Sequence, residues 1–238
     1  MSYGLQCYDG AGRLVFDSNI PAYALGYIGA FTFSADNGSF FTDYTVNHPT
    51  RPIPFIVYPN NGSAVIGIES ITSLGSNNWR IRLIDMLVSG TGRSRPTIHC
   101  FGRATGTPAS TFGLQCFRAD GSCDFDTTRG LLNVSLTSDV PGLYSTSTTQ
   151  PVESGIALGG VSNAAVRFSG SGTADRYTGG SPTGIRRQFY RGATLSGTTL
   201  TPNWGLRDQY NEDGGITSTG LWLASAQRLL VINTAKFT

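Results

Sequence analysis

Apolar and polar residues alternate over many short stretches of the chain, and this pattern predicts β-strands. Successive side chains of a strand point to opposite faces of its sheet, so a half-buried strand alternates with a period of two. In the first half, the predicted strands are residues 25–34, 40–46, 53–58, 64–71, 79–84 and 97–101. In the second half, they are residues 131–136, 164–168 and 185–190, followed by a hairpin of 221–224 with 228–232. The pattern therefore predicts an all-β fold.

Residues 4–17 and 113–126 form an internal repeat. They read GLQCYDGAGRLVFD and GLQCFRADGSCDFD, which are identical at seven of fourteen positions without a gap. Unrelated segments would share about one residue, so the repeat is real. In each copy, a strand-like GLQC segment runs into a glycine turn and returns through Phe16 or Phe125. Asp-Gly between such segments is a strong hairpin signal, so we expect two equivalent hairpins.

The turn also predicts the register of these hairpins. A two-residue loop at positions 120 and 121 determines which residues lie opposite each other. In the second copy, it sets Cys116 opposite Phe125 and Arg118 opposite Cys123; in the first copy, the equivalent pairs are Cys7 with Phe16 and Asp9 with Leu14.

A turn-rich connector at residues 102–111 suggests a boundary between two β-sandwich-like modules, residues 1–110 and 111–238, each containing one hairpin. Residues 138–160 and 170–203 are rich in Gly, Ser, Thr and Pro and are predicted to be long loops. Such loops are usually functional or ordered by a partner.

Three prolines, Pro52, Pro54 and Pro59, surround the predicted strand 53–58. Proline has no backbone N–H to donate to a neighbouring strand and is therefore largely confined to edge strands. We expect this strand at the edge of a sheet.

The composition is polar but weakly charged. Only 13% of the 238 residues are charged, the net charge is +2, and the cations are sixteen Arg with Lys236. They form no run of like charge, whereas general nucleic-acid binding requires a concentrated positive face. No segment approaches the roughly 20 apolar residues of a membrane span, and the start lacks a basic region followed by an apolar stretch. We expect a protein synthesised in the cytoplasm, without nucleic-acid binding or membrane insertion.

The sequence lacks the motifs of a nucleophilic enzyme, a metal site or a phosphate-binding loop. His48 lies in a turn-like Asn-His-Pro context and His99 in an apolar strand, so we expect both to be structural. No GxSxG, Walker A, GxGxxG or CxxC pattern occurs. The four cysteines, Cys7, Cys100, Cys116 and Cys123, are expected to be reduced and at least half-buried. We expect no catalytic residues, no cofactor and no metal.

Paired carboxylates are the one set of residues suited to a glycosidase. The candidates are Glu69 with Asp85, or Asp208 with Glu212 and Asp213, but such a pair is defined by a spatial separation that sequence does not give. Residues 211–215, NEDGG, are better interpreted as a solvated turn. Asp120, Asp124 and Asp126 lack the spacing of a calcium loop.

One segment of the second half interleaves guanidinium groups with aromatic rings, a composition found at protein interfaces and at sites for anionic glycans. The alternative is an ordinary strand with arginines on its solvent face. The candidate interface residues are Tyr177, Arg186, Arg187, Phe189, Tyr190, Arg191 and Trp204.

The opening segment GLQCYDGAGRLVFDS and its second copy, Gly113 to Thr127 followed by RGLLNV, resemble motifs of small proteins from long-tailed bacteriophages. In that group, an aromatic-GLQ strand leads through a glycine turn into FDS or FDT, and its members are associated with the tail tip or baseplate. The resemblance implies a structural virion component that assembles with other tail proteins. A receptor-binding module for a host surface glycan or protein is the alternative, and a surface-glycan depolymerase is a third.

We also expect self-association. Long Gly, Ser and Thr rich loops bury too little apolar area to offset the entropy of being ordered, and a partner surface would supply that area. Unpaired strand edges favour association as well. By analogy with tail tips, the expected state is a homo-oligomer of three copies, located in the virion.

Overall fold

The computed structural model describes most of the chain. The described residues are 6–8, 10, 14–17, 23–30, 34–36, 39–58, 65–85, 96–103, 115–117, 121, 123–126, 130–140, 143–145, 153–161, 163–169, 173–180, 183–213, 222–224 and 226–237. Within them, every regular element is a β-strand except one 3-10 turn at Thr234–Lys236. The chain is therefore all-β, as predicted, and most of the predicted strands lie close to observed ones.

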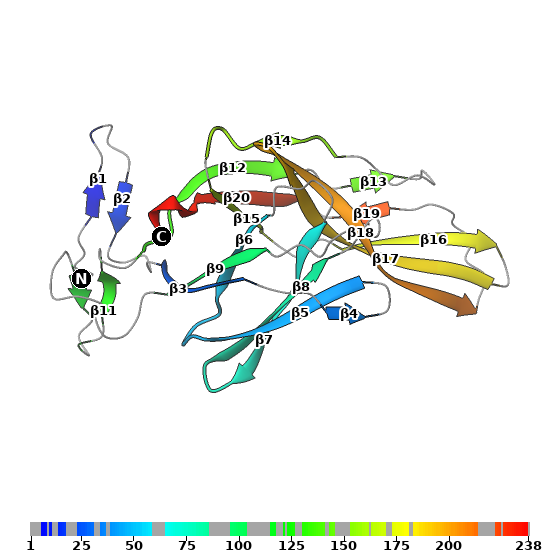
Figure 1. Ribbon diagram of the computed structural model, residues 1–238, viewed down its shortest axis with the longest axis horizontal. Coiled ribbons are helices and arrows are strands. Elements are labelled where there is room, and N and C mark those ends of the chain that lie inside the picture. The colour runs from blue at the N-terminus through cyan, green and yellow to red at the C-terminus, as the bar shows by residue number, and fades with distance from the viewer. Residues whose placement is uncertain are drawn as a thin grey trace.

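Six antiparallel strands form the first large sheet. In spatial order, they are β12 (Val134–Val140), β20 (Gln227–Asn233), β15 (Ala164–Phe168), β6 (Ile53–Val57), β9 (Thr97–Arg103) and β3 (Tyr23–Ala30). In Figure 1, β12 and β20 of this sheet run along the upper part of the molecule.

The second large sheet has eight strands. Seven follow the order β14 (Ile156–Ala157), β18 (Thr199–Asp213), β17 (Thr183–Ser196), β7 (Ile66–Gly75), β8 (Asn78–Asp85), β5 (Ser39–Asn47) and β4 (Ser34–Asp36), and β16 (Thr173–Gly180) pairs with β17. A short pair, β13 (Leu143–Ser145) with β19 (Trp222–Ala224), is hydrogen-bonded to neither large sheet, and its strand β19 lies beside β16.

The hydrophobic core lies between the two large sheets. Ile56, Ile98 and Val231 of the first sheet belong to the same buried cluster as Ile66 and Leu83 of the second. On the opposite face of the first sheet, Phe101 packs edge-on against Phe237, with ring centroids 5.3 Å apart. Strand β9 is therefore buried on both faces, which explains its nearly continuous apolar sequence.

Each large sheet contains strands from both sides of residue 110. In the first sheet, β6 lies beside β15, and in the second sheet β7 lies beside β17. The predicted boundary near residue 110 thus separates the two hairpin repeats but not the two large sheets.

Strand β6 is not an edge strand, contrary to the expectation from its prolines. It lies between β9 and β15, but its ladder with β15 consists of one register pair, Ile56 with Val166. Pro54 lacks the N–H that would extend this ladder, and its carbonyl oxygen accepts instead from Arg167 Nη1 at 3.5 Å. Strand β6 tolerates Pro54 at an interior position because its neighbour β15 diverges from it there.

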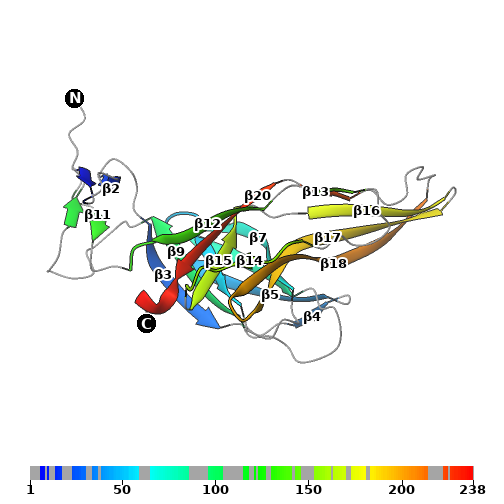
Figure 2. The same cartoon turned by 90° about the horizontal axis from the view of Figure 1, so that it is seen from above.

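Residues 170–203 are not a long loop. Strands β16, β17 and β18 occupy most of this segment and extend as a ribbon away from the core, at the right of Figures 1 and 2. Leu195 pairs with Leu200 around a tight turn at Gly197, whose φ of +59° favours glycine. Strand β18 also continues through Asp213, so residues 211–213 are not a turn.

The predicted terminal hairpin is also wrong. Strand β19 pairs with β13, whereas β20 pairs with β12 and β15. Strands β19 and β20 therefore do not pair with each other. Within 138–160, β12 extends to Val140 and β13 and β14 add short strands, so only part of that segment is irregular.

The internal repeat forms two equivalent hairpins, as predicted. Strand β1 (Gln6–Tyr8) pairs with β2 (Leu14–Asp17), and β10 (Gln115–Phe117) pairs with β11 (Cys123–Asp126). Cys7 lies opposite Phe16 and Cys116 opposite Phe125, and both hairpins have an irregularity at the same place. Because the return strand bulges there, Leu14 faces Tyr8 and Cys123 faces Phe117, one residue away from the predicted Asp9 and Arg118.

Candidate functional site

The predicted interface residues lie on the β16–β18 ribbon, but several are buried within the chain. Phe189, Arg191 and Trp204 are buried and Tyr190 is half-buried, so the first three offer no surface to a partner. Tyr177 and Arg186 are register partners, and Arg187 lies opposite Gln209; the side chains of these three residues lie outside the described part of the structure.

Arg191 is the centre of a buried polar cluster. Its Nε and Nη2 donate to Glu153 Oε1 at 3.1 and 2.6 Å, and its Nη1 donates to Gln227 Oε1 at 3.3 Å. Trp204 Nε1 donates to the same Glu153 oxygen at 2.8 Å, and the guanidinium lies 4.8 Å from the Trp204 ring centroid. The cluster fastens the segment before β14 to the ribbon, which is a structural role.

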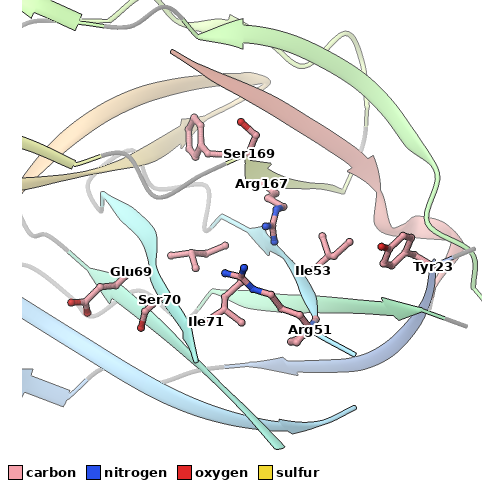
Figure 3. Close-up of a pocket in the computed structure, with 11 residues that line it drawn as sticks. Tyr23, Arg51, Ile53, Glu69, Ser70, Ile71, Arg167 and Ser169 are labelled. Carbon is pink, nitrogen blue, oxygen red and sulfur yellow. The ribbon is translucent and has the colours of Figure 1, made fainter. Parts of the chain in front are cut away.

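A cavity of about 330 Å³ opens where β6 and β15 of the first sheet face β7 of the second. Figure 3 shows two arginines, Arg51 and Arg167, whose guanidinium groups point toward one another in this cavity. The lining residues are Tyr23, Arg51, Pro52, Ile53, Ile68, Glu69, Ser70, Ile71, Arg167, Phe168 and Ser169. The volume lies at the lower end of the range for small-molecule pockets.

Two local features of the backbone create this cavity. The ladder between β6 and β15 ends after Ile56, next to Pro54, so the two strands separate there. On the facing sheet, Ile68 pairs with Leu83 and Ser70 with Arg82, which leaves Glu69 as the extra residue of a β-bulge. A bulge interrupts the alternation of side chains, so consecutive residues of β7 line the cavity.

The arginine pair gives the cavity a positive charge. Burial lowers the pKa of Arg167, and the nearby charge of Arg51 lowers it further. Among the described residues, no carboxylate forms an ion pair with either arginine. The charged residues of the lining are Arg51, Arg167 and Glu69, which together carry a formal charge of +1.

The carboxylates considered for glycosidase chemistry are separated. Glu69 lines the cavity, whereas Asp85, at the end of β8 opposite Ile66, is buried and does not line it. Asp208, Glu212 and Asp213 lie on β18, and their side chains are outside the described residues.

Asp85 makes stability depend on pH. Burial raises its pKa to about 6 from an ordinary value of 3.8, and its Oδ1 has no hydrogen-bond partner in the described structure. Between these two values, the unfolded state releases the proton more readily than the folded state, so stability falls as pH rises. The loss is about 3 kcal/mol at most and is complete above pH 6. We therefore expect Asp85→Asn to raise the urea midpoint at pH 8 and to have little effect at pH 4.

Asp43→Asn is the control for this experiment, because its sign is opposite. Two hydrogen bonds from Arg82, both 2.6 Å, lower the pKa of Asp43, so its stabilisation is present at neutral pH and lost on acidification. Asp43→Asn should lower the urea midpoint at pH 8. A destabilised Asp85→Asn protein at pH 8 would contradict the account of Asp85.

The histidines occupy the predicted structural positions. His48 Nδ1 accepts from the backbone N–H of Thr50 at 3.1 Å, and a Cβ at Gly102 would lie 2.0 Å from its ring. His99 lies in β9, where burial lowers its pKa. Neither histidine lines the cavity.

The cysteines are placed as expected where their side chains are described. Cys100 and Cys123 are buried, Cys116 is half-buried, and none of the three forms a disulfide in that part of the chain. Burial raises the pKa of Cys100 to about 12. The side chain of Cys7 lies outside the described residues.

Metal and membrane features are absent from the residues that the structure describes. No group of three or more His, Cys, Asp or Glu side chains is arranged to hold a metal ion there. The same residues contain no helix of the length and apolarity needed to cross a membrane.

Comparison with protein-family models, curated proteins and solved structures finds no significant match to this chain.

Proposed function

We propose that this chain is a non-enzymatic structural component of the tail tip or baseplate of a long-tailed bacteriophage. The observation that carries the proposal is the pair of equivalent hairpins, whose sequences resemble a motif of tail-tip proteins. Both hairpins lie at the same end of the molecule in Figures 1 and 2 and belong to neither large sheet.

The hairpins are suited to docking on other virion proteins. A two-stranded hairpin is only marginally stable by itself, so a neighbouring surface stabilises it. Phe117, at the end of β10, is 54% exposed and provides a large apolar contact. The two hairpins have equivalent backbone pairing, so both are candidates for docking on a partner surface.

Mass spectrometry of purified phage particles tests this proposal. We expect the chain in a fixed ratio to other tail proteins. We expect Phe117→Ser, supplied to a phage lacking the wild-type gene, to reduce incorporation into particles. Leu74→Ser is the matched control, because Leu74 is 51% exposed at the far end of β7. Absence of the chain from particles would overturn the proposal.

Self-association in three copies is part of the same proposal. Residues 170–203 form paired strands and do not need a partner to order them. The projecting ribbon supports self-association, because β16 forms a described ladder with β17 only, and its neighbour β19 is much shorter, which leaves part of the β16 edge for a partner. Light scattering of the purified protein should give a mass three times the 25.3 kDa of one chain.

A receptor-binding module is the second candidate function. The cavity between β6, β7 and β15 favours it, because a purely structural protein has no need of a charged cavity open to small molecules. Adsorption of phage to host cells in the presence of free protein separates the two functions: a receptor-binding module blocks adsorption, and a structural component does not.

A further inference from the structure

The cavity lined by Arg51 and Arg167 brings two positive charges together in a partly buried place. Arg167 is half-buried in the side of the cavity, Arg51 is exposed at its mouth, and Figure 3 shows their guanidinium groups directed toward one another. Like charges in such a place repel, and the lowered pKa of Arg167 has this repulsion as one of its causes. An anion between the two groups would replace repulsion with two attractive contacts.

The guanidinium pair favours a planar anion. Glu69 also lines the cavity, but its carboxylate points away from the two guanidinium groups in Figure 3. An anion held between the arginines therefore meets their N–H donors first. Guanidinium groups match the planar geometry of a carboxylate, because two parallel N–H donors meet its two oxygens.

The rest of the lining suits a hydroxylated ring. Ile53, Ile68 and Ile71 provide apolar surface, and Tyr23 provides an aromatic ring at one side. Ser70 and Ser169 provide hydroxyl groups. Sugars combine apolar ring faces with hydroxyls, and the volume of about 330 Å³ is suited to a small ligand.

We propose that this cavity binds an acidic sugar, with its carboxylate held between Arg51 and Arg167 and its ring against the isoleucines of β6 and β7. The proposal concerns a site on the isolated chain, so it does not depend on assembly into a phage tail.

Ligand-observed NMR with the purified full-length chain tests the proposal. The probes are methyl glucuronide, methyl glucoside as its neutral analogue, acetate as a carboxylate without a ring, and inorganic phosphate. We expect saturable binding of methyl glucuronide that is at least about tenfold tighter than that of the other three, because methyl glucoside lacks the carboxylate, acetate lacks the ring and phosphate lacks both.

Arg51→Gln is the decisive variant. Arg51 is exposed, so its loss leaves the fold intact, and we expect methyl glucuronide to bind about tenfold more weakly. Arg228→Gln removes the same charge from an exposed ion pair with Asp139 outside the cavity lining, and it should bind like the wild type.

Each other outcome overturns the proposal. Equal binding of methyl glucoside shows that the carboxylate is not recognised, and equal binding of acetate shows that the ring is not. Tighter binding of phosphate by the wild type identifies a phosphate site instead. Unchanged binding by Arg51→Gln, or no binding of methyl glucuronide at all, shows that the cavity is not the site.

Discussion

Glu153→Ala is expected to destabilise the protein by about 3 to 5 kcal/mol, because it removes the carboxylate that pairs with the buried guanidinium of Arg191. The Arg191 side chain is 1% exposed and that of Glu153 is 11% exposed. One Glu153 oxygen accepts from Arg191 and from Trp204, so its loss breaks both contacts at once. Urea unfolding followed by tryptophan fluorescence measures the change.

The exposed pair of Asp139 and Arg228 provides the matched control. Its Oδ1 to Nε distance is 3.0 Å, but its side chains are 79% and 63% exposed, so Asp139→Ala should cost no more than about 1 kcal/mol. The double variant Glu153→Gln with Arg191→Met removes both charges and should be more stable than Glu153→Ala. A loss as small for Glu153→Ala as for Asp139→Ala would contradict the buried ion pair.

Gly192→Ala is expected to destabilise the protein by about 3 kcal/mol, because strands β7 and β17 approach too closely for a side chain. A Cβ at Gly192 would lie 2.5 Å from the carbonyl oxygen of Ile66, and one at Gly67 would lie 2.8 Å from that of Arg191. Both contacts are with backbone, which cannot rotate away. The two strands share one register pair, Ala193 with Ile66, so the clash lies where the two halves of the second sheet join.

The sign of this change is informative. At an uncrowded position, replacing Gly with Ala usually stabilises a protein by about 0.4 to 1 kcal/mol, because it restricts the unfolded chain. Gly10 is such a position, with no atom within 4 Å of an added Cβ, and Gly10→Ala is the control. In thermal unfolding, the midpoint temperature should fall for Gly192→Ala and rise slightly for Gly10→Ala. A stabilised Gly192→Ala protein would contradict the close approach of β7 and β17.

The alternation of residues predicted most strands of both large sheets, because it depends only on which side chains face the core. For β15, the predicted and observed bounds agree at residues 164–168. The repeat likewise predicted two hairpins of the same register. The bulge was not predictable, because the same glycine turn is compatible with a two-residue loop and with the longer loop that forms.

The amino-acid composition of some segments predicts loops where the structure has strands. Residues 170–203 are rich in Gly, Ser and Thr, but Thr pairs well in strands, and Gly197 supplies a turn between Leu195 and Leu200. A tight-turn signal at Ser196-Gly197, with Thr194 and Leu195 on one side and residues 198–201, TTLT, on the other, was present in the sequence. Pro54 suggested an edge strand for a similar reason. A proline fits an interior strand when one neighbouring strand diverges from it, as β15 does here.

Arg191 illustrates what the sequence leaves undetermined. An arginine directly after two aromatic residues on a strand suggests a solvent face, yet Glu153, 38 residues earlier, pairs with it inside the protein. Arg51, Glu69 and Arg167 are likewise far apart along the chain and meet only where β6, β7 and β15 come together. The sequence by itself determined the all-β class, most strands and the paired hairpins, because these depend on local periodicity and repetition. Only the tertiary structure decided which strands are neighbours, and with them the buried ion pair and the cavity, because periodicity assigns a side chain to a face but not to the chain segment opposite it.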